Sequence, residues 1–374
     1  MGKPTLTVGL IGYQFMGKAH SNAYRQVGRY FDLPVDVRMK TICGRTETGV
    51  RKAAETFGWE GFETDWRRVV DDPEIDIIDV STPGDSHCDI VCAAAEAGKS
   101  VWCEKPIGNT IAEAAKMRDA VAKSGKPSVV FHNYRFAPAV SLAKKWIDEG
   151  RLGRIFHFRA AYLQDWIADP QFPRVWRLEK ARTGSGALGD IGSHIIDLGR
   201  HLVGEIQSVV GQLETFVTER PLPEGGGSGP VDVDDAAAFI ARFASGALGT
   251  FEATRFAVGR KNANRFEING EKGSLVFDLE RMNELEYYSE LDPPGTRGFR
   301  TVLATDSSHP FAGRYWPVGH IIGYEHTFIS LVAEALLARD RGERFRPDIE
   351  DGYLNQRVLD AVERSVASKA WVNL

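Results

Sequence analysis

Three side chains of the sequence have the types that acid–base chemistry at an alcohol would need. Lys105 lies in the segment Glu104-Lys105-Pro106, and Asp190 precedes His194 by four residues. Removing a hydride and a proton from a secondary alcohol requires a base near neutral pH and a cation beside the developing alkoxide. If the stretch is helical, Asp190 and His194 share one face, and the carboxylate can orient the imidazole or raise its basicity. Alone, a loop lysine and an Asp-x-x-x-His pair are more often structural, so this interpretation needs support from other segments.

A glycine-containing turn supplies the first support. Gly12-Tyr13-Gln14-Phe15-Met16-Gly17 lies between an expected strand, 5–11, and an expected helix, 16–27. In that context a dinucleotide motif places pyrophosphate on the helix N-terminus. The match is incomplete, because Gln14 stands where glycine normally lets the backbone approach the phosphates. Gly12 and Gly17 could instead serve only a tight turn and close helix–strand packing.

The residue expected to contact the adenosine ribose is unusual. After the second strand, where an Asp or Glu would accept a hydrogen bond from the ribose 2′-hydroxyl, the sequence reads Cys43-Gly44-Arg45-Thr46. Arg45 could stack on adenine or pair with a 2′-phosphate, which favours NADP, whereas Glu47 could supply the acid if the loop ran differently. An ordinary solvated cation is an equally good interpretation of Arg45. The choice between NAD and NADP stays open.

Two domains must position these residues, as the length of 374 residues also suggests. Residues 1–132 alternate β-rich and helical segments, which predicts a dinucleotide-binding Rossmann domain with a doubly wound parallel sheet. The expected strands are 5–11, 35–43, 75–80, 100–103 and 128–131, and the expected helices are 16–27, 46–57, 86–97 and 110–123.

Residues 133–374 show a different pattern, which predicts an α+β domain for substrate binding and oligomerisation. Residues 154–162 alternate apolar and polar side chains, as in an antiparallel strand with one exposed face. Two hairpins are expected, 236–243 with 247–256 and 265–269 with 274–278. One face of an open sheet would be covered by helices at 187–202, 324–338 and 349–368. The other face would contact solvent or a second subunit. Segment 221–231, with Gly225-Gly-Gly-Ser-Gly, suits a flexible surface loop.

Composition and charge exclude several classes of protein. Apolar residues make up 43% and charged residues 26%, and 46 Lys+Arg against 51 Asp+Glu leave a net charge of −5. These values argue against disorder and against nucleic acid as a partner. The absence of long apolar runs argues against a membrane protein. All four cysteines lie in the first third, which indicates a reducing compartment, so we expect a cytoplasmic protein. Cys88 and Cys92 lack further ligands, and no metal site is expected.

Several separated motifs give the chain a marked resemblance to one family, the Gfo/Idh/MocA oxidoreductases, which include glucose–fructose oxidoreductase and inositol dehydrogenase. The resemblance extends over nearly the whole length, although Gln14 and Gly84 depart from the family pattern. The motifs are Gly12…Gly17 with Lys18-Ala19-His20, Ser81-Thr82-Pro83 with His87, Gly98-Lys99-Ser100-Val101-Trp102-Cys103-Glu104-Lys105-Pro106, Asn133-Tyr134-Arg135, and Gly189-Asp190-Ile191-Gly192-Ser193-His194-Ile195-Ile196-Asp197.

The resemblance implies an NAD(P)-dependent dehydrogenase that acts on a secondary hydroxyl of a sugar, sugar derivative or inositol. His194 would be the general base for oxidation, Lys105 would stabilise the alkoxide, and Asp190 would hold either the substrate hydroxyl or His194; the roles of Lys105 and His194 could be exchanged. NAD or NADP would be held by Gly12, Gln14, Phe15, Met16, Arg45, Ser81, Thr82, Pro83, His87, Glu104 and Lys105.

A polar and aromatic set could line a pocket for a sugar or cyclitol ring, because such rings offer C–H faces to indole and hydroxyl edges to bidentate side chains. The members of this set are Tyr134, Arg135, Gln164, Asp165, Trp166, Trp176 and Arg177. For each tryptophan taken separately, core packing is the more common role.

Two alternative functions are also compatible with the sequence, and the second domain suggests an oligomeric state. The same fold could use its cofactor in a closed cycle, as an NAD-dependent glycoside hydrolase does, or could serve as a non-enzymatic nucleotide or sugar sensor. The presence of Lys105, Asp190 and His194 argues against the sensor. The open sheet favours a homodimer or homotetramer.

Overall fold

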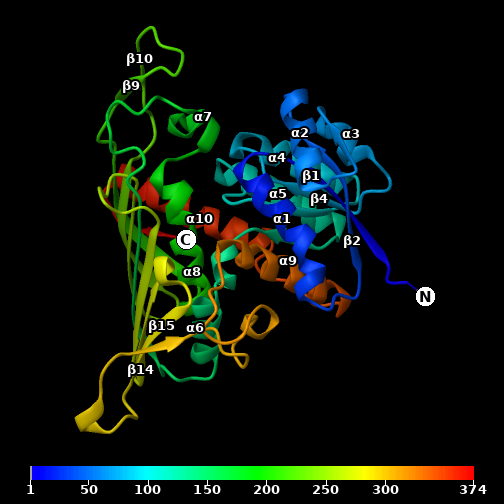
Figure 1. Ribbon diagram of the computed structural model, residues 1–374. Coiled ribbons are helices and arrows are strands. Elements are labelled where there is room, and N and C mark those ends of the chain that lie inside the picture. Colours follow the sequence, from blue (N-terminus) through cyan, green and yellow to red (C-terminus); the bar gives the residue numbers. More distant parts are fainter. Residues whose placement is uncertain (1) are drawn as a thin grey trace. The chain divides into compact units, whose positions relative to one another are not determined.

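The computed structural model describes residues 2–374 and divides into two compact units (Figure 1). The first unit contains the residues up to Asn133 together with Gly323–Leu354. The second contains Tyr134–Ile322 and Asn355–Leu374. The expected single boundary after residue 132 therefore misses the return of residues 323–354 to the first unit.

The first unit is built on a parallel sheet in the order β3-β2-β1-β4-β5-β6, as the alternating pattern predicted. Its central strands are buried because helices cover both faces, which is why their sequences are nearly continuous apolar runs. This strand order places the change of winding direction between β1 and β4, the position where open α/β sheets bind ligands. The strands are β1 (Thr5–Ile11), β2 (Asp36–Cys43), β3 (Gly61–Glu63), β4 (Ile77–Val80), β5 (Ser100–Cys103) and β6 (Ser128–Val130).

The helices of the first unit begin and end mostly where the sequence predicts. Helix α5 starts with a capping box between Thr110 and Glu113, and α4 is followed by Gly98 with φ of +72°. The six helices are α1 (Phe15–Tyr30), α2 (Glu47–Phe57), α3 (Trp66–Asp71), α4 (His87–Glu96), α5 (Ile111–Ser124) and α9 (Tyr324–Asp340).

Helix α9 corrects one expectation. It was predicted to cover the sheet of the second domain, but it belongs to the first unit and packs against α1. Phe328 of α9 stacks with Phe131, which follows β6, at a ring distance of 6.2 Å. Because α9 is buried on most of its circumference, its sequence has no single apolar stripe that could indicate which sheet it contacts.

The second unit contains a nine-stranded sheet in the order β16-β15-β14-β13-β7-β12-β11-β8-β17. All neighbouring strands are antiparallel except β7 and β12, and both expected hairpins are present as β11–β12 and β13–β14. The strands are β7 (Ile155–Leu163), β8 (Ile206–Glu214), β11 (Ala236–Phe243), β12 (Leu248–Thr254), β13 (Ala263–Gly270), β14 (Gly273–Asp278), β15 (Glu284–Ser289), β16 (Arg300–Leu303) and β17 (Val372–Asn373).

Helices α6 (Pro138–Asp148) and α8 (Ser193–Val203) lie on one face of this sheet (Figure 1). Gly199 lets α8 approach closely, since a Cβ atom there would lie 3.1 Å from the ring of Phe158. Helix α10 (Ile349–Ser368) begins in the first unit and continues in the second, where Ser365 accepts a hydrogen bond from the backbone of β8. Among residues 2–374, no helix is long and apolar enough to cross a membrane.

The segment 221–231, predicted to be a flexible surface loop, is exposed over residues 222–228 and contains part of a short ribbon. β9 (Glu219–Pro221) and β10 (Ser228–Pro230) pair as a short antiparallel ribbon. The glycines 225–227 all have positive φ, so they form the turn that joins these two strands.

Candidate active site

The glycine turn after β1 has the geometry of a phosphate cradle. Gly12 has φ of +113°, and a Cβ atom there would lie 2.7 Å from the backbone of Ser81. A Cβ atom at Gly17 would lie 2.2 Å from the carbonyl oxygen of Gly12, so both positions require glycine. Helix α1 starts at Phe15 without a side-chain cap, which leaves its first N–H groups to bind an anion. The residues at this turn therefore fit a dinucleotide pyrophosphate.

Gln14 does not obstruct this cradle through its backbone. Its φ is −76°, an ordinary value for any residue, and its side chain is exposed. Phe15 is also exposed, at 63%, and its ring stacks with Tyr324 of α9 at 6.3 Å. Met16 is half-buried. The missing glycine of the motif is thus explained by a backbone conformation that does not require one.

The loop after β4 and the start of α4 contain four of the predicted cofactor residues, Ser81, Thr82, Pro83 and His87. The Ser81 hydroxyl donates to the carbonyl of Gly12 at 3.1 Å, which connects this loop to the glycine turn. The buried His87 ring faces the carbonyls of Thr82, 2.7 Å from Nε2, and Pro106, 3.1 Å from Nδ1. Burial lowers the pKa of His87. His87 therefore lies between two loops inside the protein, and the cofactor contact predicted for it stays a prediction.

Arg45 lies at the carboxyl end of β2, where the adenosine ribose was expected. It is exposed, and no ion pair involves it among residues 2–374. Glu47, the alternative acid, bonds to Arg51 on the same helix. A cation is thus available at this position, which suits either adenine stacking or a 2′-phosphate.

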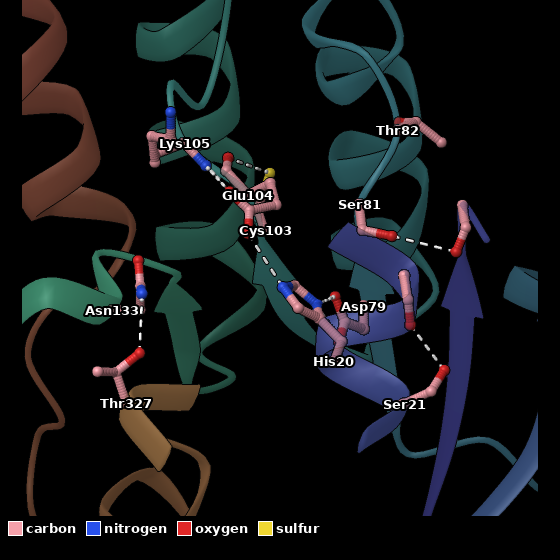
Figure 2. A network of polar contacts seen from close by, with 12 residues as sticks. His20, Ser21, Asp79, Ser81, Thr82, Cys103, Glu104, Lys105, Asn133 and Thr327 are labelled. Atoms are coloured by element: carbon pink, nitrogen blue, oxygen red, sulfur yellow. Dashed lines mark hydrogen bonds and ion pairs between the residues drawn. The ribbon is translucent and has the colours of Figure 1, made fainter. Parts of the chain in front are cut away.

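Lys105 follows the buried strand β5 at the edge of the sheet where ligands are expected. Its side chain is half-buried, and the Lys105–Pro106 bond is cis. Glu104 is only 4% exposed, and one of its carboxylate oxygens accepts the backbone N–H of Lys105 at 3.0 Å (Figure 2). The other oxygen lies 3.0 Å from Nε2 of His20. Both carboxylate oxygens of Glu104 thus have partners inside the protein, and the cofactor contact predicted for it stays a prediction.

In the second unit, Asp190 and His194 lie on one continuous helical segment, as their spacing required. Asp190 is in a π-helical turn, Leu188–Gly192, and His194 is in the first turn of α8. Such π turns occur frequently at functional sites. The His194 ring is 8% exposed and lies 4.6 Å from the ring of Tyr134.

Two residues that the sequence analysis missed hold this segment. The Asp234 carboxylate accepts the backbone N–H groups of Gly186 and Leu188, both at 2.7 Å. The buried Arg255 guanidinium lies 3.7 Å from the Asp190 carboxylate, whose side chain is 33% exposed. Neither residue has a recognisable spacing with this segment, because Asp234 precedes β11 and Arg255 follows β12.

A directional chain of hydrogen bonds begins at Tyr134, whose ring contacts that of His194. The Tyr162 hydroxyl donates to Asn262 Oδ1 at 2.7 Å, so its single proton is used there. The Tyr134 hydroxyl, 2.9 Å from that of Tyr162, must therefore donate to it. Gln164 also donates to Asn262, at 3.0 Å. Tyr134 was predicted at the site, whereas Tyr162 and Asn262 were not, because neither lies in a motif.

The other predicted substrate residues have structural partners. Arg135 forms a buried bidentate ion pair with Asp197 of α8, at 2.6 and 2.9 Å. Asp165 bonds to Lys261 at 2.8 Å and to the backbone N–H of Gly259, contacts that lower the pKa of this carboxyl.

The two tryptophans differ in their surroundings. Trp166 packs edge-on against Phe172 and lies 5.5 Å below the Arg255 guanidinium, which connects it with Asp190. Trp176 stacks under Arg177 at 4.4 Å in a separate short helix. Trp166 is thus linked to the Asp190 segment, whereas the Trp176 ring is covered by the guanidinium groups of Arg177 and Arg182.

Comparison with known proteins agrees with this architecture. A model described as an oxidoreductase family with an NAD-binding Rossmann fold matches residues 6–132, and a GFO/IDH/MocA C-terminal domain matches residues 140–276. The fold and the glycine turn define an NAD-binding oxidoreductase. The chain belongs to the Gfo/Idh/MocA family.

Several relatives are similar over almost the entire chain. A levoglucosan dehydrogenase from Pseudarthrobacter phenanthrenivorans is 45% identical, with 99% of this chain and 98% of the relative aligned. The structure of an oxidoreductase domain protein from Kribbella flavida is 52% identical, with a TM-score of 0.96 and 99% of each chain covered. A levoglucosan dehydrogenase in complex with NADH is 46% identical, again with a TM-score of 0.96 and 99% of each chain covered.

Proposed function

We propose that the protein is an NAD-dependent dehydrogenase that oxidises a secondary hydroxyl of levoglucosan or a closely related anhydrosugar. The observation that carries this proposal is the 45% identity to a levoglucosan dehydrogenase over 99% of the chain. Lys105, Asp190 and His194 are all present in this sequence, which supports an active enzyme over a sensor. A related structure contains both NADH and levoglucosan, and it has the same identity of 45%.

Each candidate catalytic residue has a distinct task in this proposal. Bound NAD supplies the acceptor for the hydride. His194 removes the hydroxyl proton during oxidation and returns it during reduction, while the Lys105 ammonium stabilises the negative charge on the oxygen. Asp190, held by Arg255, accepts a hydrogen bond from the substrate or orients His194. Tyr134 and Trp166 provide aromatic surface for the C–H face of the ring.

A substrate panel tests the proposed function. We expect the oxidation of levoglucosan to have a higher kcat/KM than that of glucose, myo-inositol or a simple glycoside. The absorbance of the reduced nicotinamide measures each reaction, with NAD and NADP assayed in parallel. Because Arg45 is an exposed cation, measurable turnover with NADP is also compatible with the site. If none of the tested sugars forms NADH and the purified protein retains bound nucleotide, the proposal is contradicted. That result would favour the alternative in which the cofactor is used in a closed cycle.

We also propose that the uncovered face of the large sheet binds a second copy of the chain. This face carries exposed Ile240 and Leu248, 42% and 40% accessible, and Ile240 lines a hollow of about 850 Å³. Charges of both signs surround them, including Arg159 and Glu267, which lie 3.8 Å apart. A face with adjacent opposite charges can pair with itself about a twofold axis, because each cation meets an anion of the partner.

Analytical ultracentrifugation tests this assembly. We expect the wild-type chain to sediment as a dimer or tetramer and Ile240→Glu to shift the population toward monomer, because burying an unpaired carboxylate in the interface is costly. Val258→Glu is the matched control, since Val258 is 83% exposed in a loop. A monomeric wild-type chain, or an Ile240→Glu variant with unchanged assembly, would contradict this interface.

We further infer a cytoplasmic location. The four cysteines are buried thiols, which suits a compartment that keeps thiols reduced. They are Cys43, Cys88, Cys92 and Cys103.

A further inference from the structure

A buried charged cluster lies beneath Lys105 in the first unit. His20 of α1 is fully buried, with Nδ1 3.0 Å from both oxygens of Asp79 on β4 and Nε2 3.0 Å from Glu104 after β5. The Tyr24 hydroxyl, also on α1, donates to Asp79 at 2.7 Å. Figure 2 shows His20 between the two carboxylates and Glu104 next to Lys105. The cluster therefore connects α1, β4 and the Lys105 segment.

The hydrogen bonds define the charge of His20. Ionised carboxylates only accept hydrogen bonds, so a ring with a carboxylate at each nitrogen must donate from both and carry a positive charge. Burial lowers the pKa of His20, but the charges and hydrogen bonds of Asp79 and Glu104 outweigh it and raise the pKa to about 9. Burial likewise raises the pKa of Glu104, but the bond and charge of His20 reverse this, and the net pKa is lower than usual.

The surroundings keep the ring in one place. Phe131 stacks on the His20 ring at a centroid distance of 3.8 Å, and Phe328 of α9 lies 5.5 Å away. Both rings are completely buried. An imidazolium so enclosed can hold a carboxylate at a fixed position, because neither partner can exchange its hydrogen bonds with water.

The Glu104 carboxylate connects His20 with the backbone of Lys105. One of its oxygens faces His20, and the other accepts the backbone N–H of Lys105 at 3.0 Å. The Glu104 backbone N–H is itself bonded to Val80 of β4 at 2.9 Å. The chain direction at Lys105, and hence the origin of its side chain, is thus fixed by a carboxylate whose own place depends on His20.

We propose that His20 is a positioning residue for Lys105, acting through Glu104 to place the lysine ammonium at the reacting hydroxyl. This inference rests on the proposed function, in which Lys105 stabilises the alkoxide. His20 touches neither Lys105 nor the glycine turn through any described hydrogen bond, so its effect on catalysis must pass through Glu104.

Two charge-matched variants test the proposal. His20→Leu with Asp79→Asn removes the donor to Glu104, and His20→Gln with Asp79→Asn restores a donor; both leave Glu104 as the single charge, so the net charge of the cluster equals that of the wild type. We expect the Leu/Asn pair to lower kcat by about 10- to 100-fold, the range that a displacement of about 1 Å can cost. The Gln/Asn pair should recover most of that loss, and NADH affinity, measured by fluorescence, should change less than about threefold in either.

Tyr24→Phe is the control for loss of a buried hydrogen bond in the same cluster, and we expect it to retain wild-type kcat. Equal losses in the Leu/Asn and Gln/Asn pairs, wild-type kcat in the Leu/Asn pair, or a loss of NADH binding that parallels the loss of kcat would each overturn the proposal. Nitrogen-15 NMR of the wild-type chain adds a test that no folding defect can affect. At pH 8, His20 should show two protonated ring nitrogens, and a neutral ring would overturn the proposal.

Lys105→Ala separates this inference from the proposed function. If Lys105→Ala abolishes turnover and the Leu/Asn pair does not lower kcat, only the positioning role of His20 is contradicted. If Lys105→Ala retains wild-type turnover, the proposed function fails first. In the Lys105→Ala background the Leu/Asn pair should produce no further loss, because residues that act as a unit are non-additive.

Discussion

Lys105→Ala is expected to lower kcat for levoglucosan by about 1,000-fold or more, which corresponds to about 4 kcal/mol of lost transition-state stabilisation. Under the proposed mechanism, the ammonium interacts with the substrate oxygen most strongly when that oxygen becomes negatively charged, so its removal affects turnover more than binding. The affinity for NADH should change only a fewfold, because the phosphate cradle is formed by Gly12, Gly17 and the start of α1. Steady-state kinetics and fluorescence titration measure the two effects separately.

Lys123→Ala is the matched control, since Lys123 is exposed at the end of α5 and should be replaceable without loss of activity. Full turnover by Lys105→Ala would remove Lys105 from the mechanism. Loss of NADH binding together with turnover would instead assign Lys105 to the cofactor.

His194→Asn is expected to lower kcat/KM by about 100- to 10,000-fold, the contribution typical of a positioned general base. Asparagine is the better replacement, because His194 is 8% exposed and packs against the Tyr134 ring, so alanine would also leave a cavity. The variant should lose the rise of kcat/KM with pH that deprotonation of the base produces in the wild type. Measuring kcat/KM from pH 5 to pH 10 tests both expectations.

His201→Asn provides the control on the same helix, α8, and should keep the wild-type pH profile. If His194→Asn retains that profile, another group is the base. The exchange of roles with Lys105 would then be the preferred mechanism, because Lys105 is the other candidate for proton transfer.

Much of the first unit follows from local sequence. Strands β1 and β5 have the predicted bounds, because each is a short run with buried side chains that ends at a glycine turn or a charged segment. Helix α10 likewise has the bounds predicted from its spacing. The assignment of α9 required tertiary information, because it is buried on most of its circumference.

The second unit was harder to predict at its edges. β15 has alternating side chains but follows a hairpin without a strong turn signal. β16 shows no such alternation, and β17 is only two residues long. Their pairing depends on the neighbouring strands of the sheet, so the local strand propensity of their residues does not predict it.

Some residues of the candidate site lie in sequence motifs, whereas others are brought together only by the fold. Lys105, Asp190 and His194 lie in motifs and could be proposed from the sequence, whereas the backbone conformation of Gln14, with φ of −76°, could not. The cluster of His20, Asp79 and Glu104 comes from three separate elements, so no spacing in the sequence relates its members. The ion pair between Arg135 and Asp197 could not be predicted, since it joins residues 62 positions apart, and the substrate contact proposed for Arg135 stays a prediction.

We propose that Lys105 and His194 act on the same hydroxyl of the same sugar. A crystal structure of the complex with NADH and levoglucosan tests it most directly. We expect one secondary hydroxyl oxygen within about 3 Å of both the Lys105 ammonium and a ring nitrogen of His194. A bound sugar with no hydroxyl that contacts both groups would contradict it.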